Sequence, residues 1–333
     1  MEQEKKYKIE VVGATGVVGR MAREVLEEKE LPIEEYAFFS SKKSAGTKIE
    51  FMGKEYTVRE LKEDSFDEGF NYAIFSAGGD TSKKYAPIAA EKGCIVVDNS
   101  SAWRMDKEVP LVVPEVNSEE IKKNKGIIAN PNCSTIQAVV PLKVLDDKYK
   151  IKRIVYSTYQ AVSGAGLKGI NDLEKGLDPN YELQKFAYPI INNCLPHIDV
   201  FLDNGYTKEE EKMINETRKI LGRPDLPITA TTVRVPVLNS HSESINIEFE
   251  NEFDLNDLKE NLKNAKGIIV EDDPQNNIYP LATTASGHDE VYVRKNKKRL
   301  QHTKRSKHMG SSRQYKKRRS KQRNTNSRRN DKT

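Results

Sequence analysis

The sequence predicts an α/β protein: a Rossmann-type doubly wound parallel sheet, then an α+β domain, then a basic tail that stays disordered. Three observations predict this organisation. A short apolar strand runs directly into a glycine-rich loop, strands alternate with helical stretches as far as residue 129, and the composition changes abruptly at residue 294. Strands that alternate with helices form parallel sheets. We therefore expect three units, at residues 1–132, 133–293 and 294–333.

The first expected strand, at residues 7–12, is followed at once by the glycine loop G-A-T-G-V-V-G. Gly13, Gly16 and Gly19 permit a tight turn, a close approach of the main chain to a pyrophosphate, and close helix–strand packing. A helix is expected over residues 20–28. A simple glycine turn would have the same letters, but the strand before it and the helix after it favour a dinucleotide site.

The second expected strand, at residues 35–39, ends in the loop S-S-K-K-S-A-G. A site specific for NAD usually has an acidic residue here, which holds the ribose hydroxyls. This loop instead carries Lys42 and Lys43 beside serines, which suits the additional phosphate of NADP. A solvated basic loop is the alternative interpretation.

Three more strands and a helix complete the first unit. We expect the strands at 72–75, 94–98 and 126–129, and the helix at 81–92. The segment S-A-G-G at 76–79 closes the first of these strands, where the main chain can approach a cofactor. Parallel sheets bind ligands beyond the carboxyl ends of their strands, and A-N-P-N-C-S-T at 129–135 follows the last strand directly.

Cys133 stands where this last loop becomes a helix. A helix N-terminus offers unpaired N–H groups and a partial positive charge, and both favour a thiolate. We therefore expect an ionised nucleophile, although a small buried apolar side chain is the alternative. Cys94 and Cys194 are far away in the sequence, and there is no C-x-x-C pair. This pattern argues for a reducing cytoplasm and against a disulfide framework or a metal site.

The second unit combines strands with amphipathic helices and is expected to be catalytic and to dimerise. Strands are expected at 151–160, 230–236 and 244–250, and helices at 209–221 and 254–265, the last with Asp254 as its cap. The strand at 244–250 alternates with period two, which suits a sheet with one open face for another subunit. Arg234, at a strand, and His241, in the loop after it, face either a common pocket or solvent.

The net charge of +5 conceals two different compositions. The chain has 55 Lys and Arg and 50 Asp and Glu, of which 18 and one lie in residues 294–333. The first 293 residues therefore carry 37 basic and 49 acidic side chains, a net charge of −12. With three large apolar residues, the tail cannot build a core. No apolar run is long enough to span a bilayer, and residues 1–6 are too charged to begin a signal peptide.

Six segments together resemble the aspartate-β-semialdehyde dehydrogenases over residues 7–293. The segments are G-A-T-G-V-V-G at 13–19, S-A-G at 44–46, D-N-S-S-A-W-R at 98–104, N-P-N-C-S-T at 130–135, Y-Q-A-V-S-G-A-G at 159–166, and R-V-P-V-L-N-S-H at 234–241. Several motifs in order, at family-like spacing, are highly specific. A match to the cysteine motif alone would also fit other phosphorylating aldehyde dehydrogenases.

The resemblance implies a reversible, NADP-dependent reductive dephosphorylation of L-aspartyl 4-phosphate to L-aspartate 4-semialdehyde and phosphate. This reaction belongs to the biosynthesis of lysine, diaminopimelate, threonine, methionine and isoleucine. The resemblance also implies a homodimer or homotetramer.

Each catalytic role is likewise implied by the resemblance. Cys133 would attack the carbonyl carbon and form an acyl-thioester, because a thiolate is a good nucleophile and a good leaving group. His241 would act as general acid/base. Gln160 would orient the thioester or the substrate, and Arg234 would clamp the substrate carboxylate.

The remaining substrate contacts and the cofactor contacts follow in the same way. Arg104 and Asn132 would hold the phosphate with help from Lys212, and Glu209 would contact the substrate amine. Composition alone would make Glu209 and Lys212 a surface ion pair. Ser163 and Gly164 would touch the nicotinamide half of NADP. The full set of cofactor-binding residues is Gly13, Thr15, Gly16, Val17, Val18, Gly19, Ser41, Lys43, Ser44, Ser76, Gly78, Ser163 and Gly164.

The resemblance stops after Val293. The family continues with two strands, the segment A-D-N-I-R-K-G-A-A and a terminal helix that helps to bind NADP, and this chain does not. When the tail is back-translated and read one base later, codons 314–321 spell N-I-R-K-G-A-A-N. Permitted codons extend this reading over the whole tail. We therefore expect one additional nucleotide near codons 293–294, and a chain that lacks a buried strand, binds NADP weakly and turns over little.

Two other functions remain open at this stage. The same chemistry could reduce another acyl phosphate, and aspartyl and glutamyl phosphate analogues would separate the two. A basic-tailed binding protein without catalysis is the second alternative, because clustered Lys and Arg neutralise nucleic-acid phosphates. The tail lacks interleaved aromatic residues, so we expect it to bind nucleic acid only nonspecifically.

Overall fold

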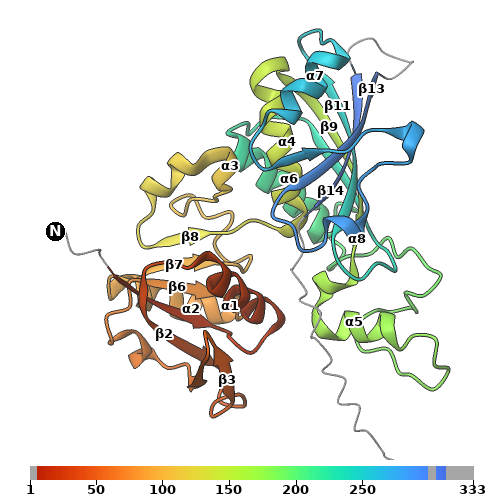
Figure 1. The fold of residues 1–333 in the computed structure, drawn as a ribbon. Helices are drawn as coiled ribbons and strands as arrows, with labels where there is room; N and C mark the ends of the chain where they lie inside the picture. Colours follow the sequence, from red (N-terminus) through yellow and green to blue (C-terminus); the bar gives the residue numbers. More distant parts are fainter. Residues whose placement is uncertain (1–5, 299–304, 313–333) are drawn as a thin grey trace, which may run out of the picture.

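The computed structural model describes residues 6–298 and 305–312. Figure 1 shows a parallel sheet in the red and orange N-terminal part and a second sheet in the green to blue part. The predicted combination of a Rossmann-type sheet with an α+β domain is confirmed. No helix in the described part of the chain is long and apolar enough to cross a membrane.

The first sheet consists of six parallel strands. These are β1 Tyr7–Val12, β2 Ile33–Ser40, β5 Arg59–Glu60, β6 Tyr72–Phe75, β7 Ile95–Asp98 and β8 Ile127–Ala129. Their order across the sheet is β5-β2-β1-β6-β7-β8. The helices of this unit are α1 Val17–Lys29, α2 Gly79–Glu91 and α3 Pro114–Asn117, with 3-10 turns at Glu63–Phe66 and Ser118–Lys123. The hairpin β3 Lys48–Phe51 and β4 Lys54–Thr57 was not foreseen from the sequence.

Both faces of this sheet are buried. On β1, Val11 packs into a cluster with Phe38 and Phe51, whereas the next residue, Val12, packs into a different cluster with Phe75. A strand that is covered on both faces is apolar at consecutive positions. This explains the consecutive apolar residues at 11–12 of β1 and at 37–39 of β2.

The second sheet is mixed and also has six strands. These are β9 Ile151–Gln160, β10 Ile228–Arg234, β11 His241–Phe249, β12 Ile268–Val270, β13 Val291–Lys298 and β14 Arg305–Ser312, in the order β10-β9-β11-β14-β13-β12. The helices are α4 Cys133–Tyr149, α5 Gly166–Glu174, α6 Lys208–Leu221, α7 Leu255–Lys263 and α8 Ala282–Ala285. Short 3-10 turns lie at Val162–Ala165 and Pro274–Asn276.

Helix α4 joins the two sheets. It begins directly after the loop that follows β8, and its Leu142 and Leu145 share a buried cluster with Ile154 of β9 and Ile245 of β11. The opposite face of β9 is more open, because the side chain of Tyr159 is 41% exposed. One face of the second sheet therefore packs on α4. The open face predicted from the alternation of β11 is not seen along the middle of this strand, because Ser244 and Asn246 are buried as well as Ile245 and Ile247.

The structure corrects the prediction for residues 305–312. The sequence predicts disorder and a missing strand, but Arg305–Ser312 forms β14, which is antiparallel to both β11 and β13. Every residue of β14 has a partner on β11. Main-chain ladders use groups that every residue except proline carries, so two open strand edges can accept a segment of unsuitable composition. Residues 299–304 and 313–333 of the predicted tail lie outside the described residues.

The prediction that His241 lies in a loop is also wrong, because His241 is the first residue of β11. Strand β10 ends at Arg234, so the segment between these residues is the connection. Strand β9, which is parallel to β10 and antiparallel to β11, lies between the two strands in the sheet. Arg234 and His241 therefore approach the same place from different strands.

Candidate active site

Cys133 is the first residue of α4, as the sequence predicts. The N-cap is Asn132, whose Oδ1 accepts hydrogen bonds from the N–H groups of Ser134 (3.0 Å) and Thr135 (3.3 Å). An Asn at this position satisfies two of the unpaired donors of the first turn. The cap therefore fixes the direction in which the Cys133 side chain leaves the helix.

His241 lies beside the sulfur. Its Nε2 is 3.2 Å from Cys133 Sγ, and its Nδ1 accepts a hydrogen bond from the backbone N–H of Ala161 (2.8 Å). Nδ1 therefore carries no proton, and the neutral ring holds its proton on Nε2, facing the sulfur. Burial, together with the positive charge of Arg234, places the pKa of His241 well below its usual range. The ring is thus a neutral donor toward Sγ.

The surroundings of Cys133 oppose the ionised sulfur that the sequence predicts. Burial, and next the negative charge of Glu209, raise the pKa of Cys133 to about 11. Arg234, Arg104 and the N–H of Ser134 act in the opposite direction with smaller effect. A helix N-terminus contributes only about 1 kcal/mol, which does not offset the desolvation of a buried charge. Cys133 is only partly buried and lines the cavity, and its raised pKa favours the thiol form near neutral pH.

Glu209, on the first turn of α6, lies inside the site. Its side chain is buried, and its Oε1 accepts hydrogen bonds from Asn132 Nδ2 (2.9 Å) and Gln160 Nε2 (3.3 Å). Its Oε2 accepts one from Lys212 Nζ (3.1 Å), which is also bound to Asp199 Oδ2 (2.7 Å). Glu209 and Lys212 do form an ion pair, but it lines the cavity and is not a surface pair.

Arg234 ends β10 and is also buried. Its Nη1 donates to the carbonyl oxygen of Ala161 (2.6 Å), whereas its Nε has no hydrogen-bond partner among the described residues. A buried guanidinium with an unsatisfied N–H is costly unless an acceptor occupies the site in another state. A carboxylate is the acceptor that matches the planar fork of arginine best.

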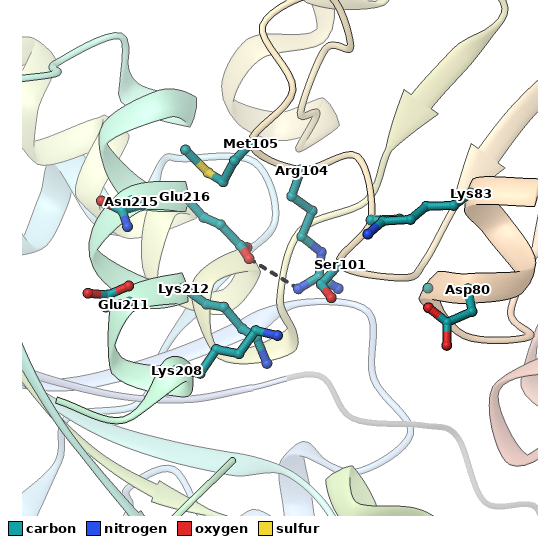
Figure 2. Close-up of a pocket in the computed structure, with 12 residues that line it drawn as sticks. Asp80, Lys83, Ser101, Arg104, Met105, Lys208, Glu211, Lys212, Asn215 and Glu216 are labelled. Atoms are coloured by element: carbon teal, nitrogen blue, oxygen red, sulfur yellow. Dashed lines mark hydrogen bonds and ion pairs between the residues drawn. The ribbon is translucent and has the colours of Figure 1, made fainter. Parts of the chain in front are cut away.

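Arg104, in the loop after β7, is held from three sides. It donates to the carbonyl oxygens of Asn130 (2.9 Å) and Asn99 (3.0 Å) and to Glu216 Oε1 (3.1 Å). Guanidinium has five N–H groups, so donors remain for an anion. Figure 2 shows Arg104 joined to Glu216, with Lys208 and Lys212 extending toward the same cavity of about 360 Å³.

A larger cavity, of about 1450 Å³, lies beside Cys133 and is also lined by two of the predicted cofactor residues, Val18 and Gly164. Its lining begins at Val18 of α1 and reaches Cys133, Gln160 and Arg234. Gly164, expected at the nicotinamide, lines the same cavity, and the adjacent Ser163 is buried in the 3-10 turn after β9. Residues predicted to bind the cofactor and residues predicted to bind the substrate therefore line one cavity.

The glycine loop after β1 has the geometry that a dinucleotide needs. A Cβ on Gly19 would lie 2.2 Å from the oxygen of Gly13, and one on Gly13 would lie 2.8 Å from the carbonyl carbon of Ser76. Gly13 and Ser76 follow β1 and β6, between which the strand order reverses. At Gly78, which has φ of 88°, an added Cβ meets nothing within 4 Å, so the space before α2 is open for a ligand.

The other predicted cofactor residues lie at the same edge of the sheet. Gly16 is the N-cap of α1, Val17 and Val18 begin that helix, and the Thr15 hydroxyl is 3.0 Å from that of Ser40. Ser41, Lys43 and Ser44 form a turn after β2, in which the N–H of Ser44 donates to the oxygen of Ser41 (2.9 Å). Parallel strands β1 and β2 end at the same edge. These residues therefore fit NADP, and the turn has no acidic residue.

Sequence reasoning missed four polar residues of the site. Glu216 binds Arg104 and also accepts the N–H of Asn132 (2.6 Å), and Asp199 binds Lys212. For Glu216, a signal was available in the sequence. Its spacing from Glu209 and Lys212, at i, i+3 and i+7, places all three residues on one face of a helix. Gln137 lies one turn after Cys133 on α4, and Glu243 lies two residues after His241 on β11. The Nε2 of Gln137 donates a buried hydrogen bond of 2.5 Å to Oε1 of Glu243.

Comparisons with known proteins agree with this site. The family "Semialdehyde dehydrogenase, NAD binding domain" matches residues 8–124, and "Semialdehyde dehydrogenase, dimerisation domain" matches residues 142–305. The aspartate-semialdehyde dehydrogenase of Aquifex aeolicus is 55% identical over 86% of this chain and 87% of its own.

Two solved structures are also similar. Aspartate semialdehyde dehydrogenase II complexed with ASA from Vibrio cholerae is 40% identical, with a TM-score of 0.88 over 93% of both chains. Aspartate semialdehyde dehydrogenase with NADP from Candida albicans is 25% identical, with a TM-score of 0.73 over 92% of this chain and 93% of that chain. The identity, the coverage and the two family matches lead to one conclusion: this chain belongs to the aspartate-semialdehyde dehydrogenase family.

Proposed function

We propose that Cys133 and the groups around it carry out the reductive dephosphorylation of L-aspartyl 4-phosphate. The products are L-aspartate 4-semialdehyde and inorganic phosphate, and the reaction serves amino-acid biosynthesis. The observation that carries the proposal is the 3.2 Å contact between Cys133 Sγ and His241 Nε2 at the start of α4, in one cavity with Arg234 and Arg104. The Vibrio cholerae relative in complex with ASA supports this substrate.

The charges of the site match those of the substrate. The Arg234 Nε, which has no partner in the described part of the chain, would bind the α-carboxylate. The remaining donors of Arg104 would bind the phosphoryl group together with Asn132 and Lys212. Glu209 would accept the α-ammonium group. Each charged group of an aspartyl phosphate thus finds a partner of opposite charge.

The chemistry proceeds through the sulfur. The Cys133 thiol first loses its proton to solvent in the cavity. The resulting thiolate attacks C4 of the acyl phosphate, a C–S bond forms, the C–O bond to the phosphoryl group breaks, and phosphate leaves. The Nε2–H of His241 donates first to the thiolate and then to the developing oxyanion. Because Nδ1 accepts the Ala161 N–H, this geometry favours the acid half of the acid/base role over the base half. Gln160 and Asn132 hold Glu209 in place.

NADPH, when bound, supplies the hydride that reduces the thioester. Gly13, Gly16, Gly19 and Gly78 would hold its pyrophosphate, and Ser163 with Gly164 would lie against the nicotinamide. Ser41, Lys43 and Ser44 would hold the additional phosphate on the ribose, with Thr15, Val17, Val18 and Ser76 completing the contacts. The NADP complex of the Candida albicans relative supports this cofactor.

Acylation of Cys133 tests the proposal directly and does not require NADP. Incubation with aspartyl phosphate is expected to add one aspartyl group to the peptide that contains Cys133, with release of one phosphate. Cys133→Ser and Arg234→Leu serve as comparisons, and both are expected to lose the adduct. An adduct on Cys194 in place of Cys133, or none at all, would rule the proposal out.

The remaining properties belong to the same proposal. A homodimer or homotetramer would cover the open face of the second sheet, in line with the dimerisation-domain match. A reducing cytoplasm would suit a reactive thiol, and the basic residues 294–333 would bind nucleic acid only nonspecifically. The boundaries 1–132 and 133–293 place the nucleophile as the first residue of the catalytic domain.

The tail is proposed to be read one nucleotide out of frame from about codon 294. The shifted reading of codons 305–312 is G-L-N-I-W-V-V-A, which contains three β-branched residues and one tryptophan. The actual segment, R-S-K-H-M-G-S-S, contains neither type. Since β14 occupies the middle of a sheet, the shifted reading suits this strand much better. Resequencing codons 290–300 tests the proposal, and an unchanged frame there would contradict it.

A further inference from the structure

Glu209 is hydrogen-bonded to the side chain of the residue that precedes the nucleophile. Asn132, to which Glu209 is hydrogen-bonded at 2.9 Å, is both the residue before Cys133 and the N-cap of its helix. Glu209 is 5% exposed, so solvent screens its charge very little. The carboxylate and the sulfur therefore act on each other in a region of low dielectric constant.

Charged and titratable groups face Cys133 from four elements. Glu209 approaches from α6, Arg234 from β10, His241 from β11 and Arg104 from the loop after β7. Arg104 is already paired with Glu216, and Lys212 divides its charge between Glu209 and Asp199. Among these groups, Glu209 is the one that opposes a negative charge on the sulfur.

The substrate class changes this balance at one point. An α-amino acyl phosphate brings an ammonium group, and under the proposed function that group lies against Glu209. Opposite charges about 4 Å apart interact by about 4 kcal/mol in a partly buried site. The α-carboxylate acts in the other direction, because it neutralises Arg234. The ammonium is therefore the part of the substrate that can favour the thiolate.

We propose that Glu209 couples recognition of the substrate ammonium to ionisation of Cys133, so that the sulfur becomes nucleophilic when an amino acid occupies the site. This inference rests on the proposed function and adds regulation to it. An acyl phosphate without the amine would meet a protonated thiol, and it would lose acylation rate as well as affinity. Glu209 is in this sense a determinant of specificity at the step of bond formation.

Alkylation of Cys133 by iodoacetamide tests the coupling without turnover, since the thiolate is the reacting form. The rate is followed on the Cys133 peptide by mass spectrometry at pH 8, with the exposed Cys194 as an internal reference. Glu209→Gln is expected to react about tenfold faster than wild type, because removing one adjacent charge shifts a pKa by about one unit. Glu182→Gln, which changes an exposed carboxylate outside the site, is expected to match wild type. An unchanged rate in Glu209→Gln with an unchanged Cys194 rate would overturn the proposal.

A matched pair of ligands repeats the test on the unmodified chain. L-alanine carries the ammonium and the carboxylate, whereas propionate lacks only the ammonium, and neither is long enough to cover the sulfur. L-alanine is expected to accelerate alkylation of Cys133, and propionate to slow it or leave it unchanged. Equal rates in the two solutions would reject the coupling. If Cys133 is nevertheless acylated by aspartyl phosphate, the proposed function stands; if it is not, the proposed function itself has failed.

Discussion

At the scale of the residue, burial determines the state of the catalytic groups more than local sequence does. Cys133 sits at a helix N-terminus, as predicted, but desolvation and the negative charge of Glu209 raise the pKa of its thiol to about 11. His241 is fully buried, and burial keeps its ring neutral. Sequence reveals which residue types meet, but it does not reveal how much solvent remains between them. This is why the residues were predicted and their protonation was not.

A second buried acid, Glu10 in the middle of β1, gives a prediction for stability. Burial raises the pKa of Glu10 to about 8, against a weaker opposing effect of its contact with the Cys94 thiol. The folded state therefore holds a proton that the unfolded state releases above its ordinary pKa of 4.5. Stability accordingly falls as pH rises from about 4.5 to 8.

Glu10→Gln removes this titration and keeps the shape of the side chain. The free energy of unfolding of the variant is expected to gain on that of wild type as pH rises, by at most about 1.4 kcal/mol per pH unit. Urea unfolding between pH 5 and about pH 8 measures the difference. Glu50→Gln, at an exposed position of β3, is expected to show no such gain. Parallel pH curves for Glu10→Gln and wild type would contradict the assignment.

At the scale of the element, two helices assemble the site. Helix α4 carries Asn132 and Cys133 at its start, and α6 presents Glu209, Lys212 and Glu216 on one face. Glu216 holds the N–H of Asn132 and also the guanidinium of Arg104. The anion-binding arginine and the helix of the nucleophile are therefore positioned by the same carboxylate.

Helix α7 offers a test of the capping predictions away from the site. The Asp254 side chain accepts hydrogen bonds from the N–H groups of Asn256 (2.8 Å) and Asp257 (3.0 Å). Asp254→Ala is expected to lower the free energy of unfolding by about 1 kcal/mol and to leave Cys133 alkylation unchanged. Urea denaturation, with the exposed Glu252→Ala as the comparison, measures the loss. A variant as stable as wild type would show that the cap is unimportant.

Most elements were predictable because they have strong local patterns. Strands β6 and β9 have the predicted limits, and α7 has the predicted cap, because apolar period and capping residue are both local signals. The hairpin β3–β4 was missed because half of its residues are charged and most are exposed. The position of His241 was wrong because the start of β11 is polar and is buried only by its neighbours. Boundaries that depend on tertiary contacts were not visible in the sequence.

At the scale of the whole molecule, the gap between β11 and β13 in the second sheet is filled by β14, whose sequence is unfavourable for a central strand. Strand β14 lies between β11 and β13, where the ladder depends on main-chain groups alone. The prediction of a missing strand considered side chains and overlooked this possibility. The composition still matters for stability, because R-S-K-H-M-G-S-S offers one large apolar residue, Met309, and no β-branched residue to a strand in the middle of a sheet.

Restoring the reading frame from codon 294 is therefore expected to stabilise the protein. The restored chain is expected to melt about 5 °C or more above the present one, and to bind NADP more tightly. Differential scanning calorimetry and equilibrium dialysis of NADP measure the two effects. Equal melting temperatures and equal affinities would show that the tail is not the defect we propose.

The central claim, that Cys133 mediates a phosphate-dependent redox reaction, is tested most directly by NADPH formation from aspartate semialdehyde, NADP and phosphate. The frame-restored chain is expected to form NADPH only when phosphate is present, with the present chain far slower, and Cys133→Ala is expected to reduce the rate about a thousandfold or more. NADPH formation that needs no phosphate, or a rate that survives Cys133→Ala, would contradict the account.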